Sequence, residues 1–454
     1  MQDLTTGPVT RHLLRTTSFM LVTMVFQTLY FLIDLYWVGR LGKEAVAGVG
    51  VAGNLTFVVL AISQMLGVGT TALVAHASGR KDQPQALHVF KQSQGLSMLV
   101  AAGFFVVFWS LRTRYARGLA ADDAAARSAL DYLRWYIPAM ALQFGVVAMG
   151  AALRGTGNFR PGMIVGSATI VINILLAPVL IFGWGTGRAF GVAGAAMSTL
   201  VAVLVGTVWL LAYFLLEDSY LRITPGDWAP RLDTWRQVLR IGLPAGAEFL
   251  MMGVYMVIVY AVTRPFGSEA QAGFGIGQRI VQAGFMPVVA LGFAVAPVAG
   301  QNVGAGLSHR VRATFRSAAL MASGGMLLFA FISHLAPAAM VRVFSADPHV
   351  VEVGADYLRI ISWTYVASGL IFISASMFQA MGNTLPSLAA SLIRVLLVGA
   401  AAFALSRRPG FALWQLWYVA VMAAGVQLVV ALGLLRREFG RRLGVAPGPA
   451  AGPA

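Results

Sequence analysis

Four sequence blocks of this chain recur at one constant offset. Asp131-Tyr132-Leu133-Arg134 recurs as Asp356-Tyr357-Leu358-Arg359, an offset of 225 residues (356 − 131 = 225). Because one register serves all four blocks, nearly the whole chain is a duplication, and each half is expected to fold alike. The other three blocks are Gly157-Asn158 with Pro161, the pattern Gly42, Glu44, Ala45, Ala47, Gly48, Gly50, and Leu66-Gly67 with Gly79.

The composition restricts the environment of both halves. Apolar residues make up 58% of the chain and charged residues 11%, against roughly 25% charged residues in soluble proteins. Stretches such as Ser18–Ile33 and Gly162–Ile181 carry almost no charge, and about 20 apolar residues are enough to cross a bilayer as a helix. The chain is therefore expected to be a polytopic membrane protein. The absence of cysteine excludes disulfides and thiolate metal sites.

Twelve membrane spans are predicted, six in each repeat. An even number brings both halves into the membrane in the same orientation, related by a pseudo-two-fold axis along the membrane normal. The expected fold is an all-α membrane protein of two six-helix lobes, an organisation that indicates a transporter. The predicted spans are 13–38, 46–75, 93–111, 129–152, 161–184, 190–216, 238–262, 270–300, 318–336, 355–380, 385–406 and 412–435.

The connections predict the lobe boundary and the topology. The longest connection, near Glu217–Gln237, joins the halves. We therefore expect an N-terminal lobe over 1–225, a C-terminal lobe over 226–445 and a disordered tail over 446–454. Arg and Lys are in excess on the side that holds both termini, which predicts cytoplasmic termini in the cell inner membrane. The net charge of +16 is scattered over these connections, so a basic membrane rim, and not nucleic acid, is expected to account for it.

Asp34 is the strongest single indication of chemistry. It lies near the end of the first span, in Tyr30-Phe31-Leu32-Ile33-Asp34. Acids inside membrane spans are rare and mark ion pathways or proton relays. Asp34 is therefore predicted to bind and release a coupling proton, and Tyr30, one turn earlier on the same face, could bond to it. The alternative is that Asp34 reaches interfacial water and caps the helix end.

Glu248 is the other acid inside a span. Pro244 and Gly246 precede it and are expected to loosen the start of its helix, which suits a cation site. The alternative places Glu248 in a first helical turn near the interface, where an acid complements the helix dipole. Both interpretations are left open at this point.

Other polar and flexible residues inside the spans are candidates for binding. Asn173 and Thr199 are polar residues within the spans, and hydrogen bonding between helices is their default role; a position beside Asp34 is implied only by the family resemblance given below. Methionine and glutamine side chains could line an adaptable cavity for varied drug-like small molecules, although most methionines will face lipid or other helices. The substrate-binding candidates are Met24, Gln27, Gln143, Met252 and Met256.

Enzyme signatures are missing from the sequence. There is no P-loop, so transport is not expected to be driven by nucleotide hydrolysis in this chain. There is no His-Glu-x-x-His motif, and the six histidines have no metal-ligand spacing. We therefore expect no enzyme activity, no metal and no cofactor other than a coupling ion, H⁺ or Na⁺.

An ordered set of motifs resembles the multidrug and toxic compound extrusion (MATE) transporters. Asp34 followed by Val38-Gly39-Arg40-Leu41-Gly42 is similar to the region between the family's first two helices. Leu153-Arg154-Gly155-Thr156-Gly157-Asn158 is similar to the connection between helices four and five. Asn173 and Thr199 match polar positions of helices five and six, and Gly242-Leu243-Pro244 is similar to the start of helix seven.

The resemblance implies antiport, in which a drug-like and often cationic compound leaves as protons or sodium ions enter while two lobes rock. Asp34 matches the coupling aspartate of the DinF-like branch. That branch has a second aspartate where this chain has Ala177, so a two-carboxylate sodium site is incomplete and protons are favoured. The glutamate of the sodium-type branch falls at Met252, one turn after Glu248.

These observations predict a monomeric secondary multidrug antiporter in contact with membrane lipids, proton-coupled through Asp34. A lipid or polysaccharide flippase of the same superfamily is the alternative. Arg279 and Arg394 are the main basic residues within the spans, too few to favour a phosphate-binding cavity of that kind. A membrane-embedded enzyme would need a clustered acid, base or metal set, and none is visible in the sequence.

Overall fold

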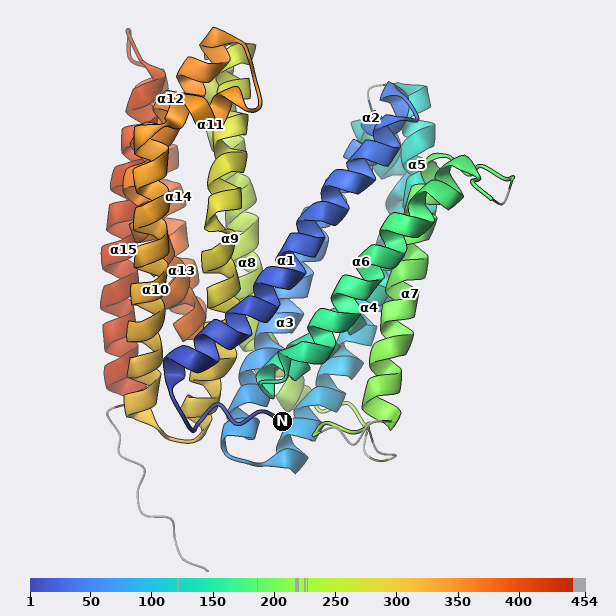
Figure 1. Cartoon of the computed structure of the whole chain (residues 1–454), viewed down its shortest axis with the longest axis vertical. Helices are drawn as coiled ribbons and strands as arrows, with labels where there is room; N and C mark the ends of the chain where they lie inside the picture. The colour runs from blue at the N-terminus through green and yellow to red at the C-terminus, as the bar shows by residue number, and fades with distance from the viewer. Residues whose placement is uncertain (121, 186, 217–219, 224–225, 227, 444–454) are drawn as a thin grey trace, which may run out of the picture. The chain divides into compact units, whose positions relative to one another are not determined.

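The computed structural model describes residues 1–120, 122–185, 187–216, 220–223, 226 and 228–443, and the regular structure of this part is helical (Figure 1). The helices are α1 (Val9–Gly39), α2 (Lys43–Gly53), α3 (Leu55–Gly79), α4 (Gln83–Leu119), α5 (Asp123–Gly155), α6 (Phe159–Phe182), α7 (Val192–Leu216), α8 (Leu232–Thr263), η1 (Arg264–Phe266), α9 (Ser268–Gly304), α10 (Ser308–Leu335), α11 (Pro337–Arg342), α12 (Pro348–Ile361), η2 (Ser362–Thr364), α13 (Tyr365–Ala380), α14 (Leu385–Ser406) and α15 (Leu413–Leu443).

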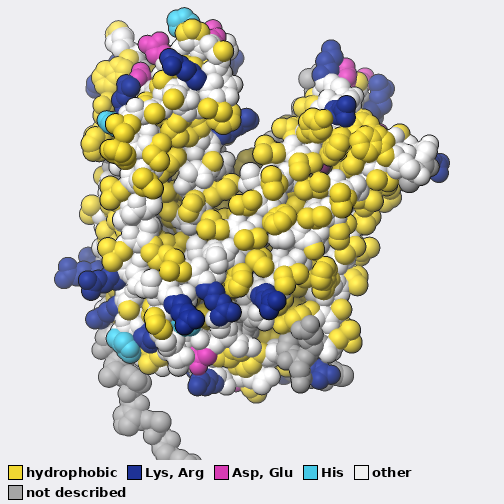
Figure 2. All heavy atoms as spheres, viewed as in Figure 1, with side chains coloured by type: hydrophobic (Ala, Val, Ile, Leu, Met, Phe, Trp, Pro, Cys, Tyr) yellow, Lys and Arg dark blue, Asp and Glu magenta, His cyan; other side chains and the backbone are white. Residues whose placement is uncertain are grey.

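Twelve helical segments in the described part are long and apolar enough to cross a membrane, which confirms the predicted number. Two spans combine α2 with α3 and α12 with α13, and α8 continues into η1. Figure 2 shows hydrophobic side chains over the middle of the helices and Lys and Arg side chains near the helix ends. This distribution matches a lipid-facing apolar band between two polar interfaces.

The chain divides into two compact units. Unit 1 consists of Met1–Asp3 and Ser18–Gly246, and unit 2 consists of Leu4–Thr17 and the chain from Ala247 onward. The division into these units therefore falls within α1 and within α8. The lobe boundary after residue 225, which was placed in the longest connection, stays a prediction. The predicted tail, 446–454, lies outside the described residues.

Two glycines of α8 explain why its first half belongs to unit 1. A Cβ atom on Gly242 would lie 1.9 Å from the carbonyl oxygen of Met65 in α3, and one on Gly246 would lie 2.7 Å from that of Ala61. The two helices therefore touch backbone to backbone over one turn, a contact that only glycine allows. Pro244 lies in the helix interior. Pro244 and Gly246 therefore do not lie at a helix start, as was expected, and Gly246 serves close packing against α3.

The repeat reappears in the backbone hydrogen bonds of the connections. After α3, Arg80 N–H donates to His76 and Asp82 N–H to Ala77; after α9, Ala305 N–H donates to Gln301 and Leu307 N–H to Asn302, each 225 residues later. Asn158 Nδ2 donates to the Tyr213 hydroxyl at 3.1 Å, and the equivalent Asn383 Nδ2 donates to Glu438 Oε1 at 3.1 Å. The recurring blocks therefore fix the helix ends within each unit.

Lys81 occupies a left-handed backbone conformation, with φ of 60°, and its repeat equivalent Gly306 has φ of 71°. A side chain costs about 1 kcal/mol in this region, whereas glycine does not. We expect Lys81→Gly to stabilise the protein by about 1 kcal/mol and Gly306→Lys to destabilise it by a similar amount. Thermal unfolding of detergent-purified protein measures both. A lower stability of Lys81→Gly would instead show that the exposed ion pair of Lys81 outweighs the strain.

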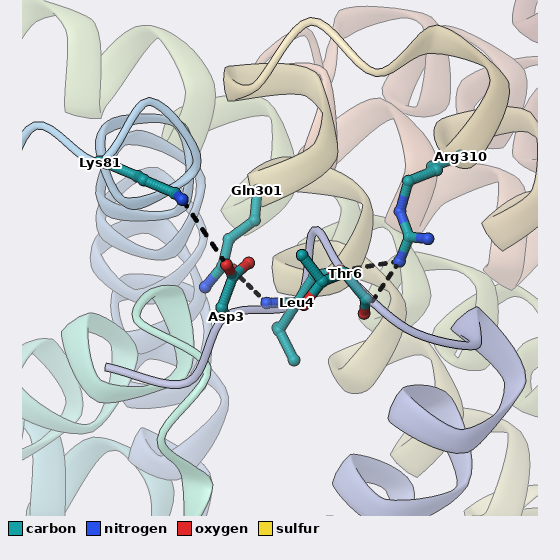
Figure 3. Close-up of polar contacts among 6 residues, drawn as sticks. All are labelled: Asp3, Leu4, Thr6, Lys81, Gln301 and Arg310. Atoms are coloured by element: carbon teal, nitrogen blue, oxygen red, sulfur yellow. Dashed lines mark hydrogen bonds and ion pairs between the residues drawn. The ribbon is translucent and has the colours of Figure 1, made fainter.

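That ion pair belongs to the N-terminal segment (Figure 3). Within unit 1, Asp3 lies 4.0 Å from Lys81. Within unit 2, the fully buried Leu4 donates its N–H to Gln301 Oε1 at 3.0 Å, and Arg310 donates to the carbonyl oxygens of Leu4 and Thr6 at 3.3 Å. The segment that precedes α1 is thus held in place by hydrogen bonds between its backbone and the side chains of the buried Gln301 and the half-buried Arg310.

Candidate functional site

The helix that carries Asp34 is loosely packed. None of the most apolar 18-residue stretch of α1 is buried, and only 17% of the corresponding stretch of α8 is buried. These two helices are the first of each repeat. Few buried apolar contacts mean that a helix can move at a low free-energy cost. The two candidate coupling acids, Asp34 and Glu248, therefore both lie on the first helix of a repeat.

Three of the predicted residues meet within unit 1. Thr199 Oγ1 on α7 donates to the Ala195 carbonyl oxygen at 3.2 Å and accepts from Asn173 Nδ2 on α6, also at 3.2 Å. The Tyr30 hydroxyl on α1 lies 3.2 Å from the same Oγ1 atom. Either hydroxyl can be the donor in this contact. The hydrogen bonds join α1, α6 and α7 at one buried threonine.

Asp34 lies beside this cluster without bonding to it. Its Oδ1 atom is buried and has no hydrogen-bond partner in the structure. The expected hydrogen bond from Tyr30 goes to Thr199 instead, and Oδ1 does not cap the end of α1. A buried, unpaired carboxylate oxygen costs several kcal/mol in an apolar environment. This atom is therefore available for a proton or for a new hydrogen-bond donor.

Two tyrosines that the sequence did not suggest belong to the same site. Tyr132 and Tyr136 of α5 are both buried, and like Tyr30 they interact electrostatically with Asp34. The Tyr136 hydroxyl also lies 2.8 Å from Thr56 Oγ1 on α3. Tyr132 stands in the recurring block Asp131–Arg134. An aromatic hydroxyl preserved in both repeats was the available signal.

Glu248 is bound within unit 2 by two serines of α14. Ser387 Oγ of α14 donates to the Glu248 carboxylate at 3.1 Å, and Ser391 Oγ donates to it at 2.8 Å. Gln427 Nε2 of α15 donates to Ser391 at 3.2 Å. Since α8 begins at Leu232, Glu248 is not in a first helical turn, and the dipole interpretation is wrong.

The two acid sites use equivalent helices at different depths. Asp34, Asn173 and Thr199 lie on α1, α6 and α7, and Glu248, Ser391 and Gln427 lie on α8, α14 and α15, their repeat equivalents. Glu248 precedes the position equivalent to Asp34, Val259, by 11 residues (259 − 248 = 11). At about 1.5 Å per residue this is roughly 16 Å along the helix. Duplication therefore kept the helices and not the depth of the carboxylate.

The substrate-binding candidates are placed separately in each unit. In unit 1, Met24 and Gln143 are half-buried and Gln27 is exposed; in unit 2, Met256 is half-buried and Met252 is 49% exposed. A cavity of about 660 Å³ in unit 2 is lined by residues of α8 and α14 such as Ile258 and Phe403. None of the five substrate-binding candidates lines this cavity. Their role as substrate contacts stays a prediction.

The MatE family profile matches residues 20–179 and 244–403. The chain belongs to the MatE family. The two matches begin 224 residues apart (244 − 20 = 224), so each covers one of the repeats. This MatE protein is a multi-pass membrane transporter, and not an enzyme.

Individual relatives are similar over nearly the whole MatE chain. A "Probable multidrug resistance protein NorM" of Deinococcus radiodurans is 27% identical over 449 residues, which cover 95% of this chain and 96% of the relative. A "FAD transporter" of Shewanella oneidensis is 25% identical and covers 87% of both chains. "Crystal structure of MATE in the straight conformation" is 25% identical with a TM-score of 0.89, covering 97% of this chain and 98% of that one. Relatives with similar sequence identity to this chain thus have names that state different transported compounds.

The acids of this MatE transporter do not form a metal centre. No group of three or more His, Cys, Asp or Glu residues that could hold a metal ion exists in the described part of the chain. Asp34 and Glu248 instead each lie near hydroxyl and amide groups. Such a set supports proton binding and hydrogen-bond exchange.

Proposed function

We propose that this transporter is a secondary antiporter that exports organic cations in exchange for protons by alternating access, with Asp34 as the proton-binding group. The observation that carries the proposal is the buried Asp34 Oδ1 atom without a hydrogen-bond partner. It lies on the most loosely packed helix, beside a cluster that joins three helices. Intramembrane carboxylates in such positions are typical of proton relays.

Protonation changes what Asp34 can offer to its neighbours. The ionised carboxylate only accepts hydrogen bonds, so it favours donation from the hydroxyls of Tyr30, Tyr132 or Tyr136. The protonated group also donates, and it no longer attracts those hydroxyls as an anion. The Tyr30 hydroxyl then remains with Thr199, as in this structure. Each proton thus shifts the balance of hydrogen bonds between α1 and its neighbours, and α1 can respond because little of its apolar surface is buried.

The donor set supports protons over sodium ions. Asp34 is accompanied by one amide, Asn173, and by hydroxyl groups, and the family's second acid is replaced by Ala177, which is 1% exposed. A dehydrated cation needs several oxygen ligands and negative charge to compensate for lost water. A proton needs one carboxylate oxygen without a partner, which Asp34 has.

The remaining assignments follow from composition and topology. Met24, Gln27, Gln143, Met252 and Met256 are proposed contacts for the exported compound, because methionine adapts to varied shapes and glutamine supplies both a donor and an acceptor. The basic side of the spans and both termini are proposed to face the cytoplasm, with the protein in the inner membrane as a monomer.

Purified protein in liposomes tests the proposal directly. Transport of a fluorescent organic cation is measured with a proton gradient and with a sodium gradient, each imposed separately. We expect transport with the proton gradient alone and none with sodium alone. Transport that follows the sodium gradient and ignores the proton gradient would overturn proton coupling while leaving export itself intact.

Glu248 is proposed as a second member of the ion-coupling set. Its carboxylate holds α8 to α14 through Ser387 and Ser391, so a change of its charge alters the contact between these helices. We expect Glu248→Gln to reduce proton-driven transport about tenfold, the effect of roughly 1.4 kcal/mol. Glu269→Gln is the matched control, because Glu269 is exposed at the start of α9. If both variants transport equally well, Glu248 has no part in coupling.

A further inference from the structure

Arg394 is a cation at the middle of a membrane span. It is the tenth of the 22 residues of α14, whose mean hydropathy is 2.2 over its most apolar stretch. An arginine at this depth is costly unless its charge and its donors are used, and it marks a functional site by default. No carboxylate of the described residues lies within ion-pair distance of Arg394.

The donors of Arg394 are mostly unused. A guanidinium carries five N–H donors. Nη1 donates to Gln427 Oε1 at 3.4 Å, a long contact, while the Nε atom is buried and has no hydrogen-bond partner in the structure. Glu248 is connected to this arginine only through Ser391 and Gln427. The side chain as a whole is half-buried, so part of its surface remains open.

Two tyrosines surround Arg394, and both have repeat equivalents beside Asp34. The guanidinium carbon lies 5.1 Å from the centre of the Tyr255 ring, and Tyr357 interacts electrostatically with both Tyr255 and Arg394. Tyr255 is equivalent to Tyr30 (255 − 30 = 225), and Tyr357 to Tyr132 (357 − 132 = 225). The same tyrosine pair therefore lies beside a carboxylate in unit 1 and beside a guanidinium in unit 2.

We propose that Arg394, with Tyr255 beside it, binds an anionic oxygen group, a carboxylate or a phosphate, of the exported compound. The Tyr357 hydroxyl is not counted among the ligands, because it donates to Gln278 Oε1 at 2.7 Å. The planar guanidinium fork matches such groups with two parallel hydrogen bonds, which a lysine ammonium does not reproduce. The inference rests on the proposed export of organic cations and assigns Arg394 as the residue that recognises the anionic group of a zwitterionic compound, one that carries an anionic group as well as a cationic one.

A matched pair of dyes tests the proposal. A rhodamine with a free carboxylate is a zwitterion, and the methyl ester of the same rhodamine is a cation. Binding of each to purified protein is measured by fluorescence polarisation, and proton-driven transport of each is measured in liposomes. We expect Arg394→Gln to weaken binding of the free acid about tenfold, the effect of losing a charge-assisted hydrogen bond. Binding of the ester should change less than about twofold.

Two further variants separate recognition from structure. Arg407→Gln, at the end of the same helix, removes an arginine that stacks 4.0 Å from the centre of the Phe403 ring, and the ratio of acid to ester binding should not change. Arg394→Lys keeps the positive charge but lacks the guanidinium fork. It should weaken binding of the free acid severalfold and leave binding of the ester unchanged. If Arg394→Gln does not yield monodisperse protein, the lysine variant decides. Equal losses for acid and ester, or no loss for the acid, would overturn the proposal.

A lipid phosphate is the other source of the same chemistry, and the lipid composition distinguishes it. The measurements are repeated in nanodiscs of phosphatidylcholine alone and with added phosphatidylglycerol. If Arg394→Gln releases bound phosphatidylglycerol and leaves the acid-to-ester ratio unchanged, the occupant is a lipid and the proposal is wrong. If the wild type does not transport the ester with a proton gradient, the proposed function is refuted. The ratio of acid binding to ester binding still tests the role of Arg394 in that case.

Discussion

Replacing Asp34 by asparagine is expected to abolish proton-driven transport and to leave the protein folded in the membrane. Asparagine has nearly the same size as aspartate but cannot bind and release a proton at this position. The Tyr30, Asn173 and Thr199 hydrogen bonds do not include Asp34, so they should survive the substitution. The measurement is transport of a fluorescent cation into liposomes driven by an imposed proton gradient, with dye binding to purified protein as a second readout.

The matched control for this prediction is Asp131→Asn. Asp131 is an exposed carboxylate of α5 in the same unit, so its neutralisation should leave transport within about twofold of the wild type. Dye binding by Asp34→Asn should remain measurable, because the substrate candidates are other residues. Full proton-driven transport by Asp34→Asn would exclude Asp34 as the coupling group.

A leucine in place of Gly242 is expected to prevent stable folding of unit 1. A Cβ atom at this position would lie 1.9 Å from the Met65 carbonyl oxygen and 2.7 Å from its carbonyl carbon. Backbone atoms of α3 cannot move away as a flexible side chain can, so α8 must separate from α3. We expect a loss of at least about 3 kcal/mol, at the upper end for overpacking, seen as a loss of monodisperse protein and a lower unfolding temperature.

Gly253→Leu in the same helix is the control for Gly242→Leu. A Cβ atom on Gly253 meets no atom within 4 Å, so a side chain has room there and replaces a poor helix former. The stability of this variant should stay within about 1 kcal/mol of the wild type. Equal destabilisation by both substitutions would mean that any bulky residue in α8 is harmful and that the contact with α3 is not the cause.

The fold was largely predictable because its determinants are local in sequence. Uncharged stretches of about 20 residues predict membrane spans without reference to any other part of the chain. The recurring blocks predicted two similar halves, and the equivalent hydrogen bonds after α3 and α9 confirm that these blocks set helix ends. The sequence did not predict that α1 and α8, the first helix of each repeat, would each be divided between the two compact units. They depend on which neighbours α1 and α8 pack against.

The candidate site was only partly predictable. Asp34 and Glu248 stand out in the sequence because acids are rare in membrane spans. Tyr132 and Tyr136 do not, because aromatic residues are common in spans and at their ends. Arg394 was noted among the basic residues of the spans, but its unused donors and its tyrosine neighbours depend on the rotation of α14 relative to α8 and α12.

The sequence by itself determined the membrane environment, the twelve spans, the duplication and the positions of Asp34 and Glu248 inside the spans, since hydropathy and repeat register are properties of the linear chain. Only the tertiary structure decided which groups meet. It bound Tyr30 and Asn173 to Thr199, left an Asp34 oxygen without a partner, and connected Glu248 with α14. The physical reason is that a side chain reaches only a few ångströms. Its partners therefore depend on the rotation and depth of each helix, which packing between distant segments fixes.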